Sequence, residues 1–516
     1  MKGMAMKKRG NTLTINLERP VKLISFGVFA FMILHVFCSA TYLFRNTSYD
    51  RLHVVGIENE TLDMVYVGGS AAFVYWQPLK AWNDCGFTSY SYATNSLQAE
   101  QVKAYIKEAL KTQSPRLFVI DARAFQYYSD QPSESGLRNG SDSMDFWSQA
   151  RFQLLNEYFD HRVITEETDV LSYYLDIAKY HTNTGNLASS AAWNLRNNDG
   201  VSVNKGWEWV DAYGYLEEPA DFQTEVRAEL LEHNEEILTD LLSFAHKEEV
   251  ELLFVVCPYW ITREEQEKYN TIGDLVERSG FRFLNTNEFY REMGIDFTTD
   301  FYNKNHVNLF GAAKYTEFLQ SYLQQHYDLP DHRSDGAYAS WHQDYERFRQ
   351  EEAIHSETVQ GILYDVAHGK EIAAQMQQAQ TLSEWENLAS DPRFTLLIAA
   401  AGQIEWPQSI ADQQLLNAWG FTPENTTGIR VIKNREMLYT NSGDGALAWE
   451  GRLGIWEDTP CRISLEEELG VMEIGEAVQT AKEPGLQVLV FDNNYRQIAD
   501  VALLRCDETG AAHLQR

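Results

Sequence analysis

A serine on a glycine turn is the first feature of this sequence that could do chemistry. Ser70 follows Gly68 and Gly69, and these glycines end a short run of apolar and β-branched residues at 63–67. Glycines allow a tight turn, and a serine at the end of a buried strand is a common position for a nucleophile in α/β enzymes. A plain strand-to-helix turn has the same appearance, so the serine needs a partner before it indicates catalysis.

A histidine in a polar loop is the candidate partner. His306 lies three residues after Asn303 and six residues after Asp300. A histidine near a carboxylate is a frequent general base at neutral pH. The alternative is that His306 merely caps the helix expected at 309–327. Ser70 and His306 together make a nucleophile and a base, and this combination favours the catalytic interpretation.

Alternating strands and helices must bring these two residues together. Buried strands are expected at 63–67, 115–121, 251–256 and 281–284, and amphipathic helices at 96–112, 222–248, 263–279 and 309–327. This alternation is typical of an α/β domain with a parallel sheet between helices. The candidate residues come directly after strands, where open α/β sheets bind ligands. The looser stretch 126–220 predicts an insertion over the sheet edge or the mouth of the active site.

The N-terminus has the pattern of a membrane anchor. Residues 21–44 form an apolar run of about 24 residues, which at ~1.5 Å per residue crosses a hydrocarbon core of about 30 Å. The basic residues of the tail 1–20 place that tail in the cytoplasm and the rest of the chain outside. A cleaved signal peptide is the alternative, but the run is long for one and no clear cleavage site ends it. We therefore expect a single-pass protein of the cell membrane with its bulk extracytoplasmic.

Charge and cysteine spacing argue against several classes of function. The formal net charge of −32 argues against a nucleic-acid partner, because phosphate binding requires basic patches. The five cysteines show no C-x-x-C spacing, so the sequence predicts no zinc or redox motif and no cofactor. Cys461 and Cys506 could pair if the C-terminal part lies outside the cell, and the sequence leaves that pairing open.

The sequence changes character after residue 327. Residues 328–390 are polar with helical segments, and we expect a helical linker there. Beyond it, strands are expected at 394–399, 428–432, 486–491 and 498–504. The segment 391–516 is therefore predicted to be a β-rich module, and it contains no obvious nucleophile–base pair.

The order of serine, glycine, asparagine and histidine resembles the SGNH/GDSL hydrolase superfamily. More narrowly, residues 45–327 look like its membrane-anchored, DltD-like and AlgJ-like branch, in which one N-terminal anchor precedes an extracytoplasmic hydrolase domain. The resemblance implies Ser70 as the nucleophile and His306 as the base. It also implies an oxyanion hole made by the backbone N–H groups of Ser70 and Gly86 and by the Asn95 side chain.

Two positions depart from the pattern of that superfamily. It usually has an aspartate three residues before the histidine, and this chain has Asn303 there. An amide does not stabilise an imidazolium by charge, so either Asp300 replaces the carboxylate or a Ser–His dyad suffices. This branch also often has Gly-Ser-Ser-His at the nucleophile, and here Ala71 follows Ser70. A catalytically weakened relative is therefore an alternative.

The C-terminal module resembles a second family, the interleukin-like EMT inducer (ILEI) domain. The resemblance rests on the stretches 394–398, 415–421 and 485–492. It implies a β-sandwich-like fold and a binding role, with glycan as a candidate ligand.

Together these resemblances imply a serine esterase or O-acyltransferase that acts on cell-surface glycan or cell-wall polymer outside a bacterial membrane. Proteins of the DltD-like and AlgJ-like branch work with membrane-bound O-acyltransferases, so such a partner is implied. Deacylation without a partner is a second possibility. The third is a non-catalytic accessory protein that holds glycan or docks the membrane acyltransferase.

Overall fold

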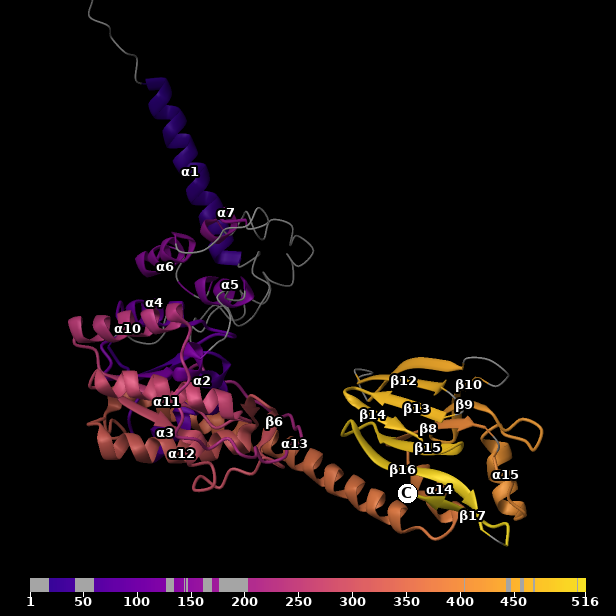
Figure 1. Cartoon of the computed structure of the whole chain (residues 1–516). Helices are drawn as coiled ribbons and strands as arrows, with labels where there is room; N and C mark the ends of the chain where they lie inside the picture. The colour runs from indigo at the N-terminus through magenta and orange to yellow at the C-terminus, as the bar shows by residue number, and fades with distance from the viewer. Residues whose placement is uncertain are drawn as a thin grey trace, which may run out of the picture. The chain divides into compact units, whose positions relative to one another are not determined.

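The computed structural model of the chain divides into two compact units (Figure 1). The first comprises Met1–Val210, Glu218–Ile295 and Lys304–Glu351, and the second Asp211–Glu217, Asp296–Asn303 and Glu352–Arg516. The structure describes residues 18–41, 60–126, 134–142, 144, 147–160, 169–175, 203–402, 404–441, 447–454, 459–466, 469–507 and 509–516.

The first unit is built on a five-stranded parallel sheet in the order β2-β1-β3-β4-β5. Its strands are β1 (Met64–Gly68), β2 (Ser89–Ala93), β3 (Leu117–Asp121), β4 (Leu252–Val256) and β5 (Arg282–Asn285). Every residue of β1, β3 and β4 is buried, which explains their continuous apolar sequences. The predicted parallel α/β arrangement is confirmed, and β2 is the one strand of this sheet that the sequence analysis did not predict.

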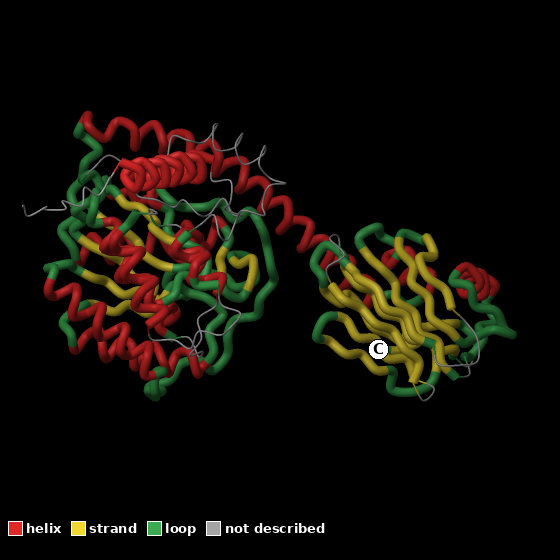
Figure 2. The backbone as a smooth tube through the Cα atoms, turned by 90° about the horizontal axis from the view of Figure 1, so that it is seen from above, coloured by secondary structure: helices red, strands yellow, loops and turns green. Residues whose placement is uncertain are grey.

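Helices cover both faces of this sheet (Figure 2). The helix α4 packs with α10, whereas α2 and α3 pack with α12. Their bounds are α2 (Ser70–Tyr75), α3 (Pro78–Cys85), α4 (Ala99–Ala109), α10 (Glu232–Lys247), α11 (Arg263–Arg278) and α12 (Leu309–His326). The helix predicted at 222–248 begins only at Glu232, so the expected start was wrong by ten residues. Before α10, residues 222–231 have no helical structure, and α10 then begins with acidic residues in its first turn.

The described parts of the predicted insertion include the helices α5 (Glu134–Asp142), α6 (Gln149–Asp160) and α7 (Leu171–Tyr174). The 3-10 turn η1 (Ala122–Phe125) comes just before the insertion. At its end, Trp207 is buried, donates from Nε1 to the Val74 carbonyl over 2.9 Å, and contacts the rings of Trp209 and Phe348. Trp207 therefore packs the domain, and its ring is not presented to a ligand.

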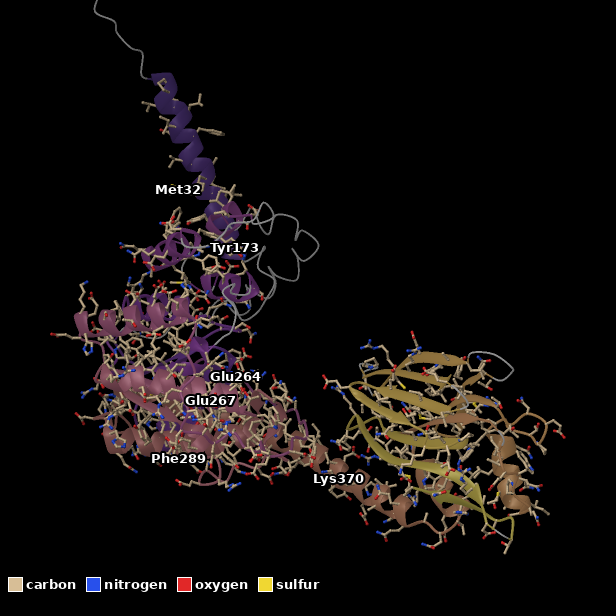
Figure 3. All side chains as sticks on the ribbon, in the orientation of Figure 1. Met32, Tyr173, Glu264, Glu267, Phe289 and Lys370 are labelled. Atoms are coloured by element: carbon tan, nitrogen blue, oxygen red, sulfur yellow. The ribbon has the colours of Figure 1, made fainter. Side chains whose placement is uncertain are left out.

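The N-terminal helix α1 (Glu18–Thr41) overlaps the run predicted as an anchor, and its side chains are described for residues 20–34. Large apolar side chains on it are exposed, including Leu23 at 77% and Phe26 at 72%, and Met32 also projects from the helix (Figure 3). Within the part of the chain that the structure describes, none of the helices combines the length and apolar character that a membrane crossing requires.

The C-terminal region is β-rich, as predicted. A six-stranded sheet in the order β10-β9-β8-β15-β16-β17 accompanies a four-stranded sheet in the order β11-β12-β13-β14. The six-stranded sheet consists of β8 (Phe394–Ala401), β9 (Gly428–Lys433), β10 (Glu436–Asn441), β15 (Gly485–Asp492), β16 (Gln497–Cys506) and β17 (Ala512–Gln515). The other sheet consists of β11 (Ala448–Leu453), β12 (Thr459–Glu466), β13 (Leu469–Ile474) and β14 (Ala477–Thr480).

Two cores lie on opposite faces of the six-stranded sheet. In β8, Leu396 and Ile398 face a core shared with α14 (Leu382–Ala389) and α15 (Ile410–Ala418), while Leu397 faces the four-stranded sheet. Alternate side chains of a strand point to opposite faces, which explains why β8 is apolar at every position except Thr395.

The linker predicted at 328–390 is helical, and most of it is one helix, α13 (Ala339–Gln378). The division between the two units falls inside α13, after Glu351. The pairing left open for Cys461 and Cys506 does not occur, since both are thiols.

Candidate active site

The structure brings Ser70 and His306 together at one edge of the parallel sheet. The Ser70 hydroxyl lies 2.6 Å from Nε2 of His306, across 236 positions of sequence. Ser70 is the first residue of α2, directly after the carboxyl end of β1, and His306 begins β7 (His306–Val307). The contact allows Nε2 to accept the hydroxyl proton when the imidazole is neutral and carries its proton on Nδ1.

A close approach of backbones explains the glycine before this serine. A Cβ atom on Gly68 would lie 2.5 Å from Cβ of Asp121 and 3.1 Å from Cβ of Ala72. Any larger residue at this position would push β1 away from the end of β3. Gly68 therefore lets the serine turn lie directly against the turn that follows β3.

The helix after His306 is capped by a different residue. The side chain of Asn308 accepts hydrogen bonds from the amides of Phe310, over 3.0 Å, and Gly311, over 3.3 Å. These bonds satisfy two of the amides at the start of α12. The alternative role considered for His306, that of a helix cap, is thus filled by Asn308.

The two other residues predicted in the histidine loop belong to the second unit. Asp300 is 2% exposed, and its carboxylate accepts hydrogen bonds from the Asp296 amide over 2.8 Å and the Thr299 hydroxyl over 3.1 Å. These two hydrogen bonds to the Asp300 carboxylate come from its own turn. Asn303 ends the short strand β6 (Phe301–Asn303).

Gly86 does not lie at this edge of the sheet, and its predicted place in an oxyanion hole requires correction. It ends α3 with a φ of 86°, and its amide donates a hydrogen bond to the Trp82 carbonyl over 2.8 Å. It also precedes the amino end of β2, whereas Ser70 follows the carboxyl end of β1, and these two strands are parallel. A glycine that closes a helix in the left-handed region explains this position without catalysis.

Asn95 lies in the loop that follows β2, on the same edge as Ser70. The Thr94 amide donates to the Gly68 carbonyl over 3.3 Å, which ties this loop to the serine turn. The Asn95 carbonyl accepts a hydrogen bond from Asn139 over 3.3 Å. The loop position is compatible with the predicted oxyanion role of the Asn95 side chain, which remains a prediction.

Two residues that the sequence analysis missed adjoin this pair. Asp121 ends β3 and Arg123 follows it, with the guanidinium Nε 3.7 Å from the carboxylate. Arg123 donates from Nη1 to the Asn305 carbonyl over 3.1 Å, directly beside His306. Both residues come after a buried strand, so the rule that selected Ser70 could also have selected them.

Burial and charge set the protonation of these groups. Burial, with the positive charge of Arg123, lowers the pKa of His306 to about 4. Burial raises the pKa of Asp121, while Arg123 and the amides of Arg123 and Gly69 act in the opposite direction. Burial also raises the pKa of Cys257 to about 12, so this nearby thiol stays neutral. His306 is consequently a neutral base over the whole physiological range.

Three buried tyrosines form hydrogen bonds next to the candidate site. The Tyr75 hydroxyl lies 2.8 Å from the Pro258 carbonyl and 3.1 Å from the Asn305 carbonyl, while the hydroxyls of Tyr66 and Tyr315 lie 3.0 Å apart. Burial holds the pKa of all three phenols well above the usual range. All three are neutral hydrogen-bonding groups, and Tyr75 holds the turn before His306 through the Asn305 carbonyl.

No known protein-family model matches this chain. No curated protein matches it either.

Proposed function

We propose that the chain is a serine-dependent acyl-transfer enzyme of the SGNH type, either an ester hydrolase or an O-acyltransferase. The observation that carries this proposal is the 2.6 Å contact between the Ser70 hydroxyl and Nε2 of His306 at the carboxyl edge of a parallel sheet. Ligands bind at this edge in open α/β folds. A serine hydroxyl in hydrogen-bond contact with a neutral imidazole is the arrangement that activates a serine nucleophile.

The proposed reaction has two halves. In the first, the Ser70 Oγ attacks the acyl carbonyl carbon and its proton passes to Nε2 of His306. The tetrahedral intermediate collapses, the proton moves from His306 to the leaving oxygen, and the acyl group remains as an ester on Ser70. In the second half, His306 deprotonates water or a sugar hydroxyl as its oxygen attacks the acyl carbon; the ester bond to Ser70 then breaks and the proton passes from His306 back to the Ser70 Oγ. The Ser70 amide and the Asn95 side chain are the proposed oxyanion donors.

The setting of this reaction is part of the proposal. The exposed apolar side chains of α1, such as Leu23 and Phe26, support its use as the membrane anchor. The substrate would then be an acylated cell-surface glycan or cell-wall polymer, reached by an extracytoplasmic domain. A membrane-bound O-acyltransferase is the proposed source of acyl groups, and the ILEI-like module is a candidate glycan-binding part.

A second candidate is a non-catalytic accessory protein with an SGNH-like domain, and two observations favour it. Asn303 occupies the position at which a carboxylate was expected. Burial and the positive charge of Arg123 lower the pKa of His306, which disfavours the imidazolium that must form during catalysis. In that case the fold would hold glycan or dock the acyltransferase without forming an acyl-enzyme.

Labelling of the full-length protein in detergent with a fluorophosphonate probe separates these candidates. We expect the wild type to be labelled, and Ser70→Ala to remain unlabelled because the reacting oxygen is gone. His306→Ala should label much more slowly, because no base takes the proton. Absence of labelling in folded wild-type protein would support the accessory role. Recovery of a multi-span acyltransferase from detergent extracts would then test the proposed partner.

A further inference from the structure

The turn after β3 touches both of the segments that carry the candidate catalytic pair. Ser70 and His306 lie far apart in the sequence and come from separate loops, so something must fix the distance between them. Asp121 contacts the serine turn, and Arg123 contacts the turn before the histidine. A single alanine separates the two residues. The serine turn and the turn before the histidine are therefore both held by one short turn at the end of a buried strand.

The serine side of this bridge is made by Asp121. Its carboxylate accepts a hydrogen bond from the Arg123 amide over 3.1 Å. The Gly69 amide, one residue before Ser70, lies close enough to this carboxylate to act against the rise of its pKa on burial. Asp121 is 3% exposed. The backbone of Gly68 lies so close to Asp121 that no Cβ fits between them. The position of the serine turn is thereby defined relative to β3.

The histidine side of the bridge is made by Arg123. Its guanidinium donates to the Asn305 carbonyl over 3.1 Å and lies 5.1 Å from the centre of the Tyr259 ring. The side chain is 12% exposed and has Asp121 as its ion-pair partner. The Tyr75 hydroxyl lies 3.1 Å from the same carbonyl, so α2, which begins with Ser70, also holds this turn.

We propose that Asp121 and Arg123 are positioning residues that together hold Ser70 and His306 in reacting contact, an inference that rests on the proposed acyl-transfer function. They form a clamp, with the Asp121 carboxylate on the serine turn and the Arg123 guanidinium on the Asn305 carbonyl. A charged pair and its hydrogen bonds fix geometry strongly when they are shielded from water. Arg123 acts on the orientation of His306 through the backbone carbonyl of the preceding residue.

The clamp also influences the protonation of His306, the proposed base. Among the described neighbours of His306 are the Ser70 hydroxyl from α2 and the positive charge of Arg123 from the turn after β3. On its own loop, Asp300 is hydrogen-bonded within its turn and Lys304 lies over the Trp260 ring. Arg123 disfavours a proton on His306, and its removal should therefore raise the pKa of the imidazole towards the ordinary value of about 6.5.

Two substitutions of Arg123 in the full-length protein separate the effect of its hydrogen bond to the Asn305 carbonyl from the effect of its positive charge. Hydrolysis of p-nitrophenyl acetate is measured from pH 4 to 8. Arg123→Gln should lower kcat/KM by about 10²-fold and move the acid limb of its pH profile upwards, because the clamp and the positive charge are both lost. Arg123→Lys should lower kcat but keep the acid limb in place, because the charge remains and the planar guanidinium is lost.

Arg263→Gln is the matched control, since Arg263 is an exposed arginine of α11 that pairs with Glu267. It should behave as the wild type. Arg123→Gln activity within twofold of the wild type, with an unmoved acid limb, would overturn the clamp. An equal loss of kcat in both Arg123 variants with no movement of the acid limb in Arg123→Gln would also overturn it. Failure of the proposed function looks different, because wild type and Ser70→Ala would then share the same background rate.

Discussion

Each edge of the five-stranded sheet holds a histidine, and the two histidines have different neighbours. At the carboxyl edge, Nε2 of His306 lies 2.6 Å from the Ser70 hydroxyl. At the amino edge, Nε2 of His332 lies 3.1 Å from the Asp63 carboxylate, which also accepts hydrogen bonds from the amide and the hydroxyl of Thr88. The His332 ring is stacked on the Tyr338 ring, with centroids 4.2 Å apart.

The difference teaches that a carboxylate next to a histidine does not identify a base. His332 has the carboxylate, but the hydroxyl in this network donates to that same carboxylate and not to the imidazole. His306 has a serine positioned as a nucleophile, and its turn is held through the backbone by Arg123. A histidine becomes a candidate base when a nucleophile points at it, whereas a histidine paired only with a carboxylate links parts of the fold.

Removal of each imidazole gives the sharpest test of this comparison. His306→Ala should lower the acyl-transfer rate by roughly 10⁴- to 10⁶-fold, as for loss of a serine–histidine unit. His332→Ala should leave the rate of the folded protein unchanged and lower the free energy of unfolding by about 1–2 kcal/mol. Ester hydrolysis and urea unfolding measure the two effects. A comparable loss of rate in His332→Ala would remove the distinction between the edges.

The next effect concerns the contact between the serine turn and β3. Gly68→Ala places a methyl group 2.5 Å from Cβ of Asp121. The two turns must then separate, and we expect the rate to fall by about 10²-fold. The position can be compared with Gly361 of α13, where a Cβ meets nothing within 4 Å. Gly361→Ala should retain full activity, and equal behaviour of the two variants in the hydrolysis assay would contradict this account.

The pH dependence of stability should come from His306. Its folded pKa of about 4 lies below the ordinary value of about 6.5, so between these values the unfolded chain binds a proton that the folded chain does not. Stability is therefore complete above pH 6.5 and is lost as the pH falls towards 4, by at most about 3 kcal/mol. Thermal unfolding across this range measures the loss, and His306→Gln should reduce it. An identical profile in that variant would assign the pH dependence to other groups.

The smallest expected effect is that of a substitution at Gly86, which tests whether this residue belongs to the amino edge of the sheet or to the active site. Gly86→Ala should cost about 1–2 kcal/mol of stability, because a φ of 86° and the nearby Asp331 carboxylate both oppose a side chain. The rate of the folded variant should match the wild type, because Gly86 lies at the amino edge. An oxyanion role for the Gly86 amide, in contrast, would make the variant slower by about 10²- to 10³-fold. Hydrolysis at a temperature well below the unfolding transition decides between them.

The strands that the sequence predicts are those buried on both faces of their sheet. β4 is a continuous apolar run and β15 is apolar except for Gln487 and Asp492, so their positions follow from the sequence directly. β2 alternates serine with tyrosine, which suggests a surface segment, yet all its residues are buried. Its serines are paired inside the protein, since Ser89 accepts from the Trp76 indole and Ser91 donates to the Ala72 carbonyl. Such partners are set by the tertiary structure, so the local pattern does not reveal them.

The residues of the candidate site also divide into those that the sequence predicts and those that it does not. Ser70 and His306 have local signals, a glycine turn in one case and a polar loop before a helix in the other. Gly86 has an equally clear local signal, but a glycine that ends a helix and a glycine that exposes an amide to a ligand look alike in a sequence. Arg123 was missed because its partner, the Asn305 carbonyl, lies 182 positions away. Main-chain partners carry no residue type that a sequence motif could record.

The buried tyrosines beneath the site give the protein an internal optical reporter. Tyr66, Tyr75 and Tyr315 are fully buried and hydrogen-bonded, and burial raises their pKa values far above those of exposed phenols. In an alkaline titration, exposed tyrosines convert first to the strongly absorbing phenolate. These three should convert only when the protein around them unfolds. A late, cooperative step in phenolate absorbance therefore records the pH at which the serine and histidine turns lose their support.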